Sequence, residues 1–110
     1  AVRVDLAPYF YSHLAQFAAC SAVADVRAVG LMAAIELVAP AETPASLSGV
    51  LGAKFRSLCG EVGLIVRAEG NTIMIAPPLI CTRSDIDRIA ERLESAFGSL
   101  TRILRAQRTA

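Results

Sequence analysis

The chain has 110 residues, of which 55% are hydrophobic and 19% charged, and its formal net charge is +1 at pH 7. This length fits one domain with a modest core. The weak net charge, without a basic stripe interleaved with aromatic residues, argues against a nucleic-acid partner. Because no apolar run reaches the ~18 residues of a membrane span, we also expect no membrane partner.

The cysteines indicate the redox environment. Cys20, Cys59 and Cys81 are odd in number and far apart, without the close pairs typical of zinc sites. We predict buried thiols, no disulfide and no metal site, in the reducing conditions of the cytoplasm. Ala1 is not a start methionine, so we expect the chain to be a piece of a longer protein.

The first expected elements are a helix and an extended segment. Residues Pro8–Cys20 carry apolar side chains at helical spacing, with Pro8 in the first turn or at a kink of a helix begun at Arg3. Residues Val26–Val38 are apolar without a helical stripe, which indicates extended structure. Gly30 marks a bulge or bend, and the pattern leaves open one bent strand or two short ones.

After a loop at Pro40–Pro44, a second helix is predicted over Leu47–Val62, where apolar residues follow one helical face. Ser46 is the expected N-cap. Gly63 is expected just beyond the C-terminus, where glycine accepts a left-handed conformation.

A hairpin and a long helix complete the chain. The apolar runs Leu64–Ala68 and Thr72–Ala76 flank a three-residue connection with a central glycine, which predicts a β-hairpin ended by Pro77–Pro78. Thr82 and Asp85 form a weak capping box before a continuous apolar stripe. Arginines follow near the helix C-terminus, where the helix dipole favours cations, at positions Arg102, Arg105 and Arg108.

The order of elements predicts an α+β domain with a small, mainly antiparallel sheet and helices packed on one face. The hairpin has a further property, because side chains alternate across a strand. Ile65 and Arg67 face one way, while Leu64, Val66 and Ala68 face the other. Both faces are therefore largely apolar, and we expect another domain or subunit to cover one of them.

Few residues carry chemistry. His13 has no catalytic partner nearby in sequence, so we interpret it as a surface or packing residue, and we interpret Glu36 as a solvated or salt-bridged strand residue. No Gly-rich phosphate loop is present. Arg67 ends an otherwise apolar run, where a guanidinium is costly to bury unless it meets an anion. The residues alone leave two interpretations open, a partly exposed edge-strand arginine and a carboxylate-binding arginine.

Two stretches resemble class III aminotransferases. Residues 26–38 resemble the V-R-G-x-G-L-M-x-x-I-E-L segment of that family, with Ala28 in place of the usual glycine. Residues 63–80 resemble its G-L-I-x-R-x-x-G-D/N-x-I-x-x-x-P-P-L-I/V run, and the helix that begins near Thr82 resembles its closing helix. The second stretch is the more specific, and the similarity spans nearly the whole chain.

The resemblance implies a fold type I enzyme that depends on pyridoxal 5'-phosphate (PLP). Residues 1–110 would be the C-terminal small domain, and PLP would be bound by a large domain outside this chain. A second subunit, in a cytoplasmic homodimer, would complete the site. In the amine:pyruvate branch, the arginine matching Arg67 binds the carboxylate of the keto or amino acid. Ornithine-type relatives instead place an arginine at the position of Met74, which favours the amine:pyruvate branch here.

The expected function is therefore substrate recognition in transfer of an amino group between an amine or omega-amino acid and pyruvate or a similar keto acid. We assign Arg67 to substrate-carboxylate binding and no residue to catalysis, cofactor binding or metal binding. Lys54, the only lysine, lies on a predicted helix surface and is no anchor for an aldehyde cofactor, so the 110-residue chain alone is expected to be inactive. The alternatives are a free-standing α+β ligand-binding or regulatory module, and a related PLP-dependent aminomutase or decarboxylase.

Overall fold

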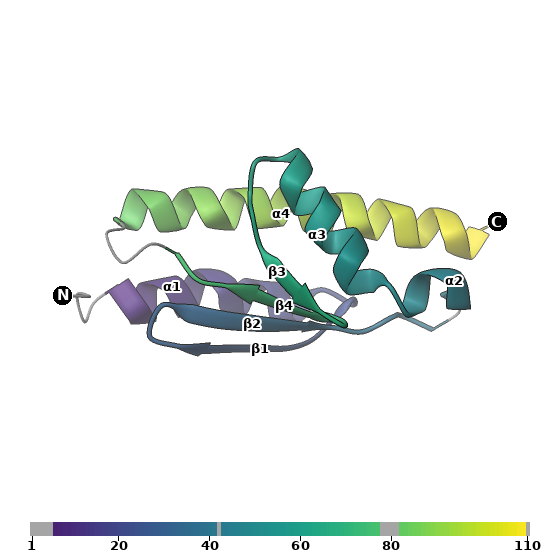
Figure 1. Cartoon of the computed structure of the whole chain (residues 1–110), viewed down its shortest axis with the longest axis horizontal. Coiled ribbons are helices and arrows are strands. Elements are labelled where there is room, and N and C mark those ends of the chain that lie inside the picture. The colour runs from purple at the N-terminus through teal and green to yellow at the C-terminus, as the bar shows by residue number, and fades with distance from the viewer. Residues whose placement is uncertain (1–5, 42, 78–81, 110) are drawn as a thin grey trace.

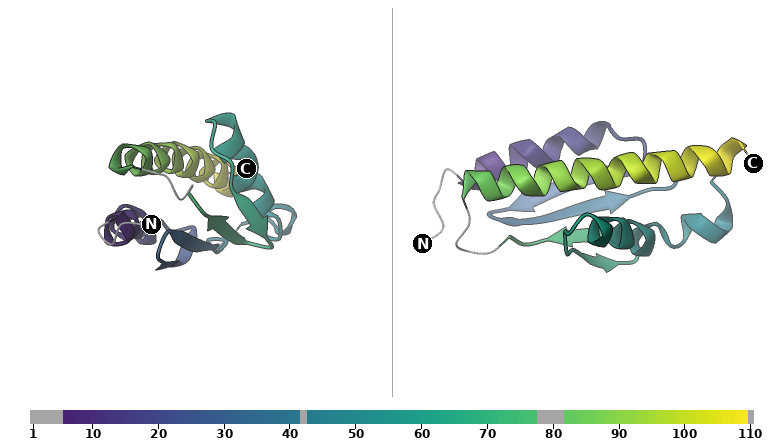
Figure 2. Two further views of the ribbon diagram at one scale, coloured as in Figure 1. Left: turned by 60° about the vertical axis from the view of Figure 1, so that its left-hand side comes forward. Right: turned by 90° about the horizontal axis from the view of Figure 1, so that it is seen from above.

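The computed structural model describes residues 6–41, 43–77 and 82–109 and contains one four-stranded antiparallel sheet with helices on one side (Figures 1 and 2). The strands lie in the order β1-β2-β4-β3. The expected α+β class is confirmed. The elements in chain order are α1 (Leu6–Ala15), the 3-10 helix η1 (Gln16–Ala19), β1 (Val23–Val29), β2 (Met32–Leu37), α2 (Ala45–Ser48), α3 (Leu51–Glu61), β3 (Arg67–Glu69), β4 (Thr72–Ile75) and α4 (Arg83–Thr109).

The core lies between the sheet and the helices. Alternate strand residues are buried against the helices, among them Ile35 and Ile73, which are fully buried. Phe97 of α4 joins two other elements, because its ring centroid lies 5.0 Å from that of Phe17 and 4.3 Å from that of Phe55. Figure 1 shows α4 running along the length of the sheet, and its apolar residues, among them Leu93 and Leu100, are buried in this core. No helix among the described residues is both long and apolar enough to span a bilayer.

The extended segment resolves into two strands. β1 and β2 form an antiparallel hairpin in which Val29 pairs with Met32. Gly30 has a φ of 59°, so it is a turn residue. Of the bulge or bend expected at this glycine, the structure has the bend, and the register shift of the pair lies elsewhere, between Val23 and Asp25.

The prediction of one helix over residues 47–62 is wrong. The structure has two helices there, α2 and α3, separated by Gly49 and Val50. Pro44 occupies the N-cap position of α2, and Ser46 lies inside that helix. The first predicted helix is likewise shorter than expected, since η1 follows α1 after Ala15.

The predicted helix caps agree with the structure more closely than the predicted helix bounds. Gly63 (φ 81°) follows the C-terminus of α3 as expected. The connection between β3 and β4 has two residues rather than three, with Gly70 at φ 58°. The capping box is confirmed, because the backbone N–H of Thr82 donates to Asp85 Oδ2 (2.9 Å) and the N–H of Asp85 donates to Thr82 Oγ1 (3.2 Å). The predictions for Arg3, Pro78, Cys81 and the side chain of Arg108 lie outside the described residues.

Candidate functional site

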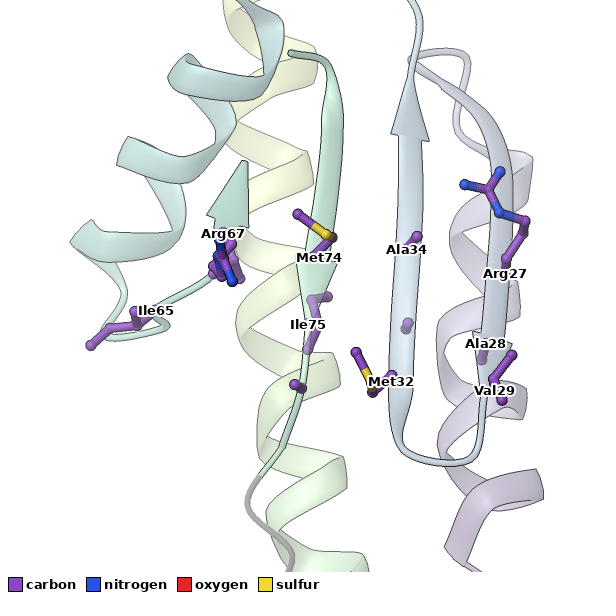
Figure 3. A pocket seen from close by; sticks show the side chains of 12 residues that line it. Arg27, Ala28, Val29, Met32, Ala34, Ile65, Arg67, Met74 and Ile75 are labelled. Atoms are coloured by element: carbon purple, nitrogen blue, oxygen red, sulfur yellow. The ribbon is translucent and has the colours of Figure 1, made fainter. Parts of the chain in front are cut away.

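The sheet face turned away from the helices, which we call the open face, holds a hollow of about 520 Å³ (Figure 3). Its floor comes from side chains of β1, β2 and β4, and one wall comes from the segment that leads into β3. The charged residues in its lining are Arg27 and Arg67, and the other lining residues are apolar. The site is thus an apolar surface with guanidinium groups as its polar features.

The two arginines lie in one row across the sheet. Arg27 pairs with Ala34, Ala34 pairs with Met74, and Met74 pairs with Arg67. Since neighbouring strands lie about 4.8 Å apart, the two arginine backbones are separated by about 14 Å. Figure 3 shows Arg67 beside Met74 and Arg27 on the far side of Ala34.

Arg27 is occupied by carboxylates of the same face. Its Nη1 lies 2.8 Å from Asp25 Oδ2 and 3.2 Å from Glu36 Oε1. The hydrogen bond to Asp25, and then the attraction of Glu36, raise the pKa of the Arg27 guanidinium. Glu36 is therefore salt-bridged, which is one of the two environments expected for it, and Arg27 already has two carboxylate partners.

Arg67 has a different environment. It begins the edge strand β3, its side chain is exposed, and it lines the hollow. Within the described part of the chain, it makes no ion pair and no side-chain hydrogen bond. Its exposed side chain lies beside the apolar floor of the hollow. The identity of its ligand stays a prediction.

The end of the open face nearest the β1–β2 turn is apolar. Val29 is 84% exposed, Met32 67% and Ile65 93%. Soluble domains rarely leave several large apolar side chains together in water. The chain's own helices leave this surface open, as the apolar pattern of the hairpin predicted.

The remaining candidate residues lie outside the hollow. Asp87 of α4 accepts a hydrogen bond from the Tyr9 hydroxyl and lies 3.0 Å from Nε2 of His13, so it ties α4 to α1. The Asp87 hydrogen bond raises the pKa of Tyr9. Lys54 is exposed on α3 and does not line the hollow. Cys59 is buried as expected, and burial raises the pKa of its thiol to about 12.

The prediction that the cysteines are buried is wrong at Cys20. Cys20 is only partly buried, and Cys81 lies outside the described residues. Among the described side chains, no group of three or more histidine, cysteine or carboxylate residues is arranged to hold a metal ion.

Asn71 is a structural residue that the sequence reasoning missed. Its Oδ1 accepts a hydrogen bond from the N–H of Gly52 (3.0 Å), and its Nδ2 donates to the carbonyl of Ser48 (3.0 Å). A Cβ on Gly52 would lie 1.9 Å from the carbonyl oxygen of Gly70, so α3 approaches the β3–β4 turn closely. A glycine inside a helix pattern was the available signal of this approach.

The family described as aminotransferase class-III matches residues 4–97. The chain is similar to the putrescine–pyruvate aminotransferase of Pseudomonas aeruginosa, with 36% identity over 89 residues that cover 80% of this chain and 20% of that protein. It is also similar to the omega-aminotransferase of Caulobacter vibrioides, with 33% identity over 78 residues that cover 71% of this chain and 17% of that protein.

Solved structures give the same result. A transaminase solved with L-alanine has a TM-score of 0.83 and 34% identity, over 92% of this chain and 24% of that one. The omega transaminase of Pseudomonas jessenii in complex with PMP has a TM-score of 0.82 and 30% identity, over 91% of this chain and 22% of that one. The chain spans about a fifth of the length of the relatives it matches. It belongs to the class III aminotransferase family.

Proposed function

We propose that residues 1–110 act as the C-terminal small domain of an aminotransferase that transfers an amino group between an amine or omega-amino acid and pyruvate or a similar keto acid. In this proposal, Arg67 binds the carboxylate of the keto acid. One observation carries it: an exposed arginine without a carboxylate partner in the described chain lines an apolar hollow. A guanidinium presents parallel N–H donors that match a carboxylate.

The edge position of Arg67 suits two unlike substrates. Its strand is paired on one side only, and its side chain has open space around it. A long, flexible arginine can extend toward a carboxylate and turn away when an uncharged amine substituent occupies the same space. The apolar floor beside it, which includes Ala34 and Met74, suits that second substrate.

The described residues do not fit PLP itself, on which the family depends. Lys54 lies on the exposed surface of α3, outside the hollow, and the hollow has no acidic residue to face a pyridine nitrogen. We therefore assign PLP to a large domain outside these residues. The protein supplies orientation in such enzymes, and this domain contributes part of it. The 110-residue chain alone is expected to show no transamination.

The large domain is also the proposed cover of the open face. About four fifths of the length of the related enzymes lies outside the matched region, which is ample chain to bury Val29, Met32 and Ile65. A second subunit, in a homodimer in the cytoplasm, is the further partner. Light scattering of the complete enzyme tests the dimer, and a monomeric active enzyme would exclude it.

The carboxylate role is tested in the complete enzyme by measuring the two half-reactions separately. Arg67→Ala removes a charged hydrogen-bonding pair worth about 1.5–3 kcal/mol, so kcat/KM for pyruvate should fall roughly 10- to 100-fold. The rate with an amine that lacks a carboxylate should stay unchanged. Arg67→Lys keeps the positive charge but loses the forked guanidinium, so its kcat/KM for pyruvate should lie between those of wild type and Arg67→Ala. Equal losses in both half-reactions would exclude the proposed role.

A further inference from the structure

The segment that carries Arg67 is attached at both ends to α3. At its start, the N–H of Leu64 donates to the carbonyl of Cys59 (2.8 Å), and the N–H of Gly63 donates to that of Gly60 (3.1 Å). At its end, Asn71 binds the first turn of α3 through Gly52. Residues 63–71 therefore form a strap that runs alongside α3 from its last turn to its first, with Arg67 at the midpoint (Figure 1).

Asn71 connects more than the helix. Its backbone carbonyl accepts a hydrogen bond from the N–H of Leu37 at the end of β2 (2.8 Å), in addition to its side-chain bonds to Gly52 and Ser48. One residue thus joins α2, α3 and the central strand β2 to the β3–β4 turn. The start of the strap has one additional contact, from Arg92 Nη1 to the Gly63 carbonyl (3.2 Å).

The chemistry of asparagine suits this junction. The N-cap of α3, Val50, makes no side-chain cap, so the N–H of Gly52 would otherwise have no partner within the helix. The amide oxygen of Asn71 accepts from that N–H, while its amide nitrogen donates to the Ser48 carbonyl. An aspartate at this position could accept the hydrogen bond from Gly52 but could not donate one to Ser48, and an alanine could form neither bond.

From these contacts we propose that Asn71 is the positioning residue for Arg67, which sets the place of the guanidinium over the hollow. This inference rests on the proposed carboxylate role of Arg67. Between its two anchors, β3 has only three residues and pairs only with β4. Release of the Asn71 anchor therefore shifts the strap, and a displacement of about 1 Å at a binding group can cost up to about 100-fold in rate.

The test is a double-mutant cycle in the complete enzyme with Arg67→Ala and Asn71→Ala. Asn71→Ala alone should lower kcat/KM for pyruvate about tenfold, as partial misplacement of Arg67 predicts. The half-reaction with a carboxylate-free amine should not change. In the Arg67→Ala background, Asn71→Ala should cause no further loss with pyruvate, because the group it positions is gone.

Two further variants separate positioning from general damage. Asn71→Asp keeps the bond from Gly52 and should lose less activity with pyruvate than Asn71→Ala; if Asn71→Ala does not fold, Asn71→Asp replaces it in the cycle. Thr43→Ala removes a side-chain bond to the Pro40 carbonyl (2.6 Å) outside the strap and should change neither half-reaction selectively.

The outcomes are distinguishable. A further loss with pyruvate in the Arg67→Ala background, or equal losses in both half-reactions, would overturn the positioning role of Asn71. An unselective effect of Arg67→Ala by itself would overturn the carboxylate role, and the positioning inference with it.

Discussion

Arg27 and Arg67 stand at opposite ends of one cross-strand row, and only Arg27 has carboxylate partners among the described residues. The sheet places Asp25 opposite Glu36, so both acids reach Arg27 and form ion pairs with it. Arg67 lies on β3, which β4 separates from the strand of Glu36, and it makes no ion pair among the described residues. The two arginines of this surface therefore have different ion-pair environments.

Substitution of Arg27 tests this division. Arg27→Ala should leave the pyruvate half-reaction unchanged, in contrast to Arg67→Ala, because its guanidinium is already bound by two acids. The variant should become more stable relative to wild type as salt rises, since Asp25 and Glu36 then repel each other less. Urea unfolding at low and high salt measures this effect. A selective loss with pyruvate would show that Arg27 also binds substrate.

Gly52 should tolerate no larger side chain. Gly52→Ala places a Cβ 1.9 Å from the Gly70 carbonyl oxygen, so α3 and the β3–β4 turn must separate. We expect a loss of about 3 kcal/mol in the free energy of unfolding, at the upper end for overpacking. Gly60→Ala is the matched control on the same helix, where a Cβ meets nothing within 4 Å, and it should stabilise by about 0.5–1 kcal/mol. Similar effects of both substitutions on urea unfolding would contradict the close approach.

Ile65 tests the cover of the open face. It is 93% exposed in this chain, so Ile65→Ala would be nearly neutral if that surface stayed in water. If a large domain buries it, the complete enzyme should lose about 2 kcal/mol or more. Val50→Ala is the control, because Val50 is 49% exposed and lies outside the hollow, and it should cost less than about 1 kcal/mol. Thermal unfolding of both variants in the complete enzyme decides between these outcomes, and equally small effects would argue against the cover.

Asp85 should make the stability of α4 depend on pH. The backbone N–H of Thr82, followed by its hydroxyl, lowers the pKa of Asp85 below its ordinary value of 3.8. A lowered carboxyl pKa means that this stabilisation is present above pH 3.8 and is lost as pH falls through the folded-state value. Asp85→Ala should therefore be less stable than wild type at pH 7, with the difference shrinking in acid.

Urea unfolding across that range measures the Asp85 effect, with Glu94→Ala as a control that removes one carboxylate from the same helix away from its cap. A difference between Asp85→Ala and wild type that persisted unchanged in strong acid would contradict the role of the ionised cap.

Local patterns in the sequence predicted much of this domain. Helical spacing identified the last helix, and the Thr82–Asp85 cap marked its start. The alternation around Arg67 indicated an apolar hairpin with an exposed arginine. These predictions succeeded because periodicity, capping and turn conformation act between residues a few positions apart.

Other features depend on residues far apart in the chain, and only the tertiary structure decided them. α2 ends at Ser48, and the Ser48 carbonyl accepts a hydrogen bond from the side chain of Asn71, which lies 23 residues later in the chain. The pairing of β2 with β4 places Ala34 beside Met74 and so sets the row that separates Arg27 from Arg67. No local pattern encodes such register or backbone approach, because both arise only when distant segments pack together. The sequence by itself singled out Arg67 as a possible anion-binding residue, and the packing of the sheet decided that Arg27 has carboxylate partners while Arg67 has none among the described residues.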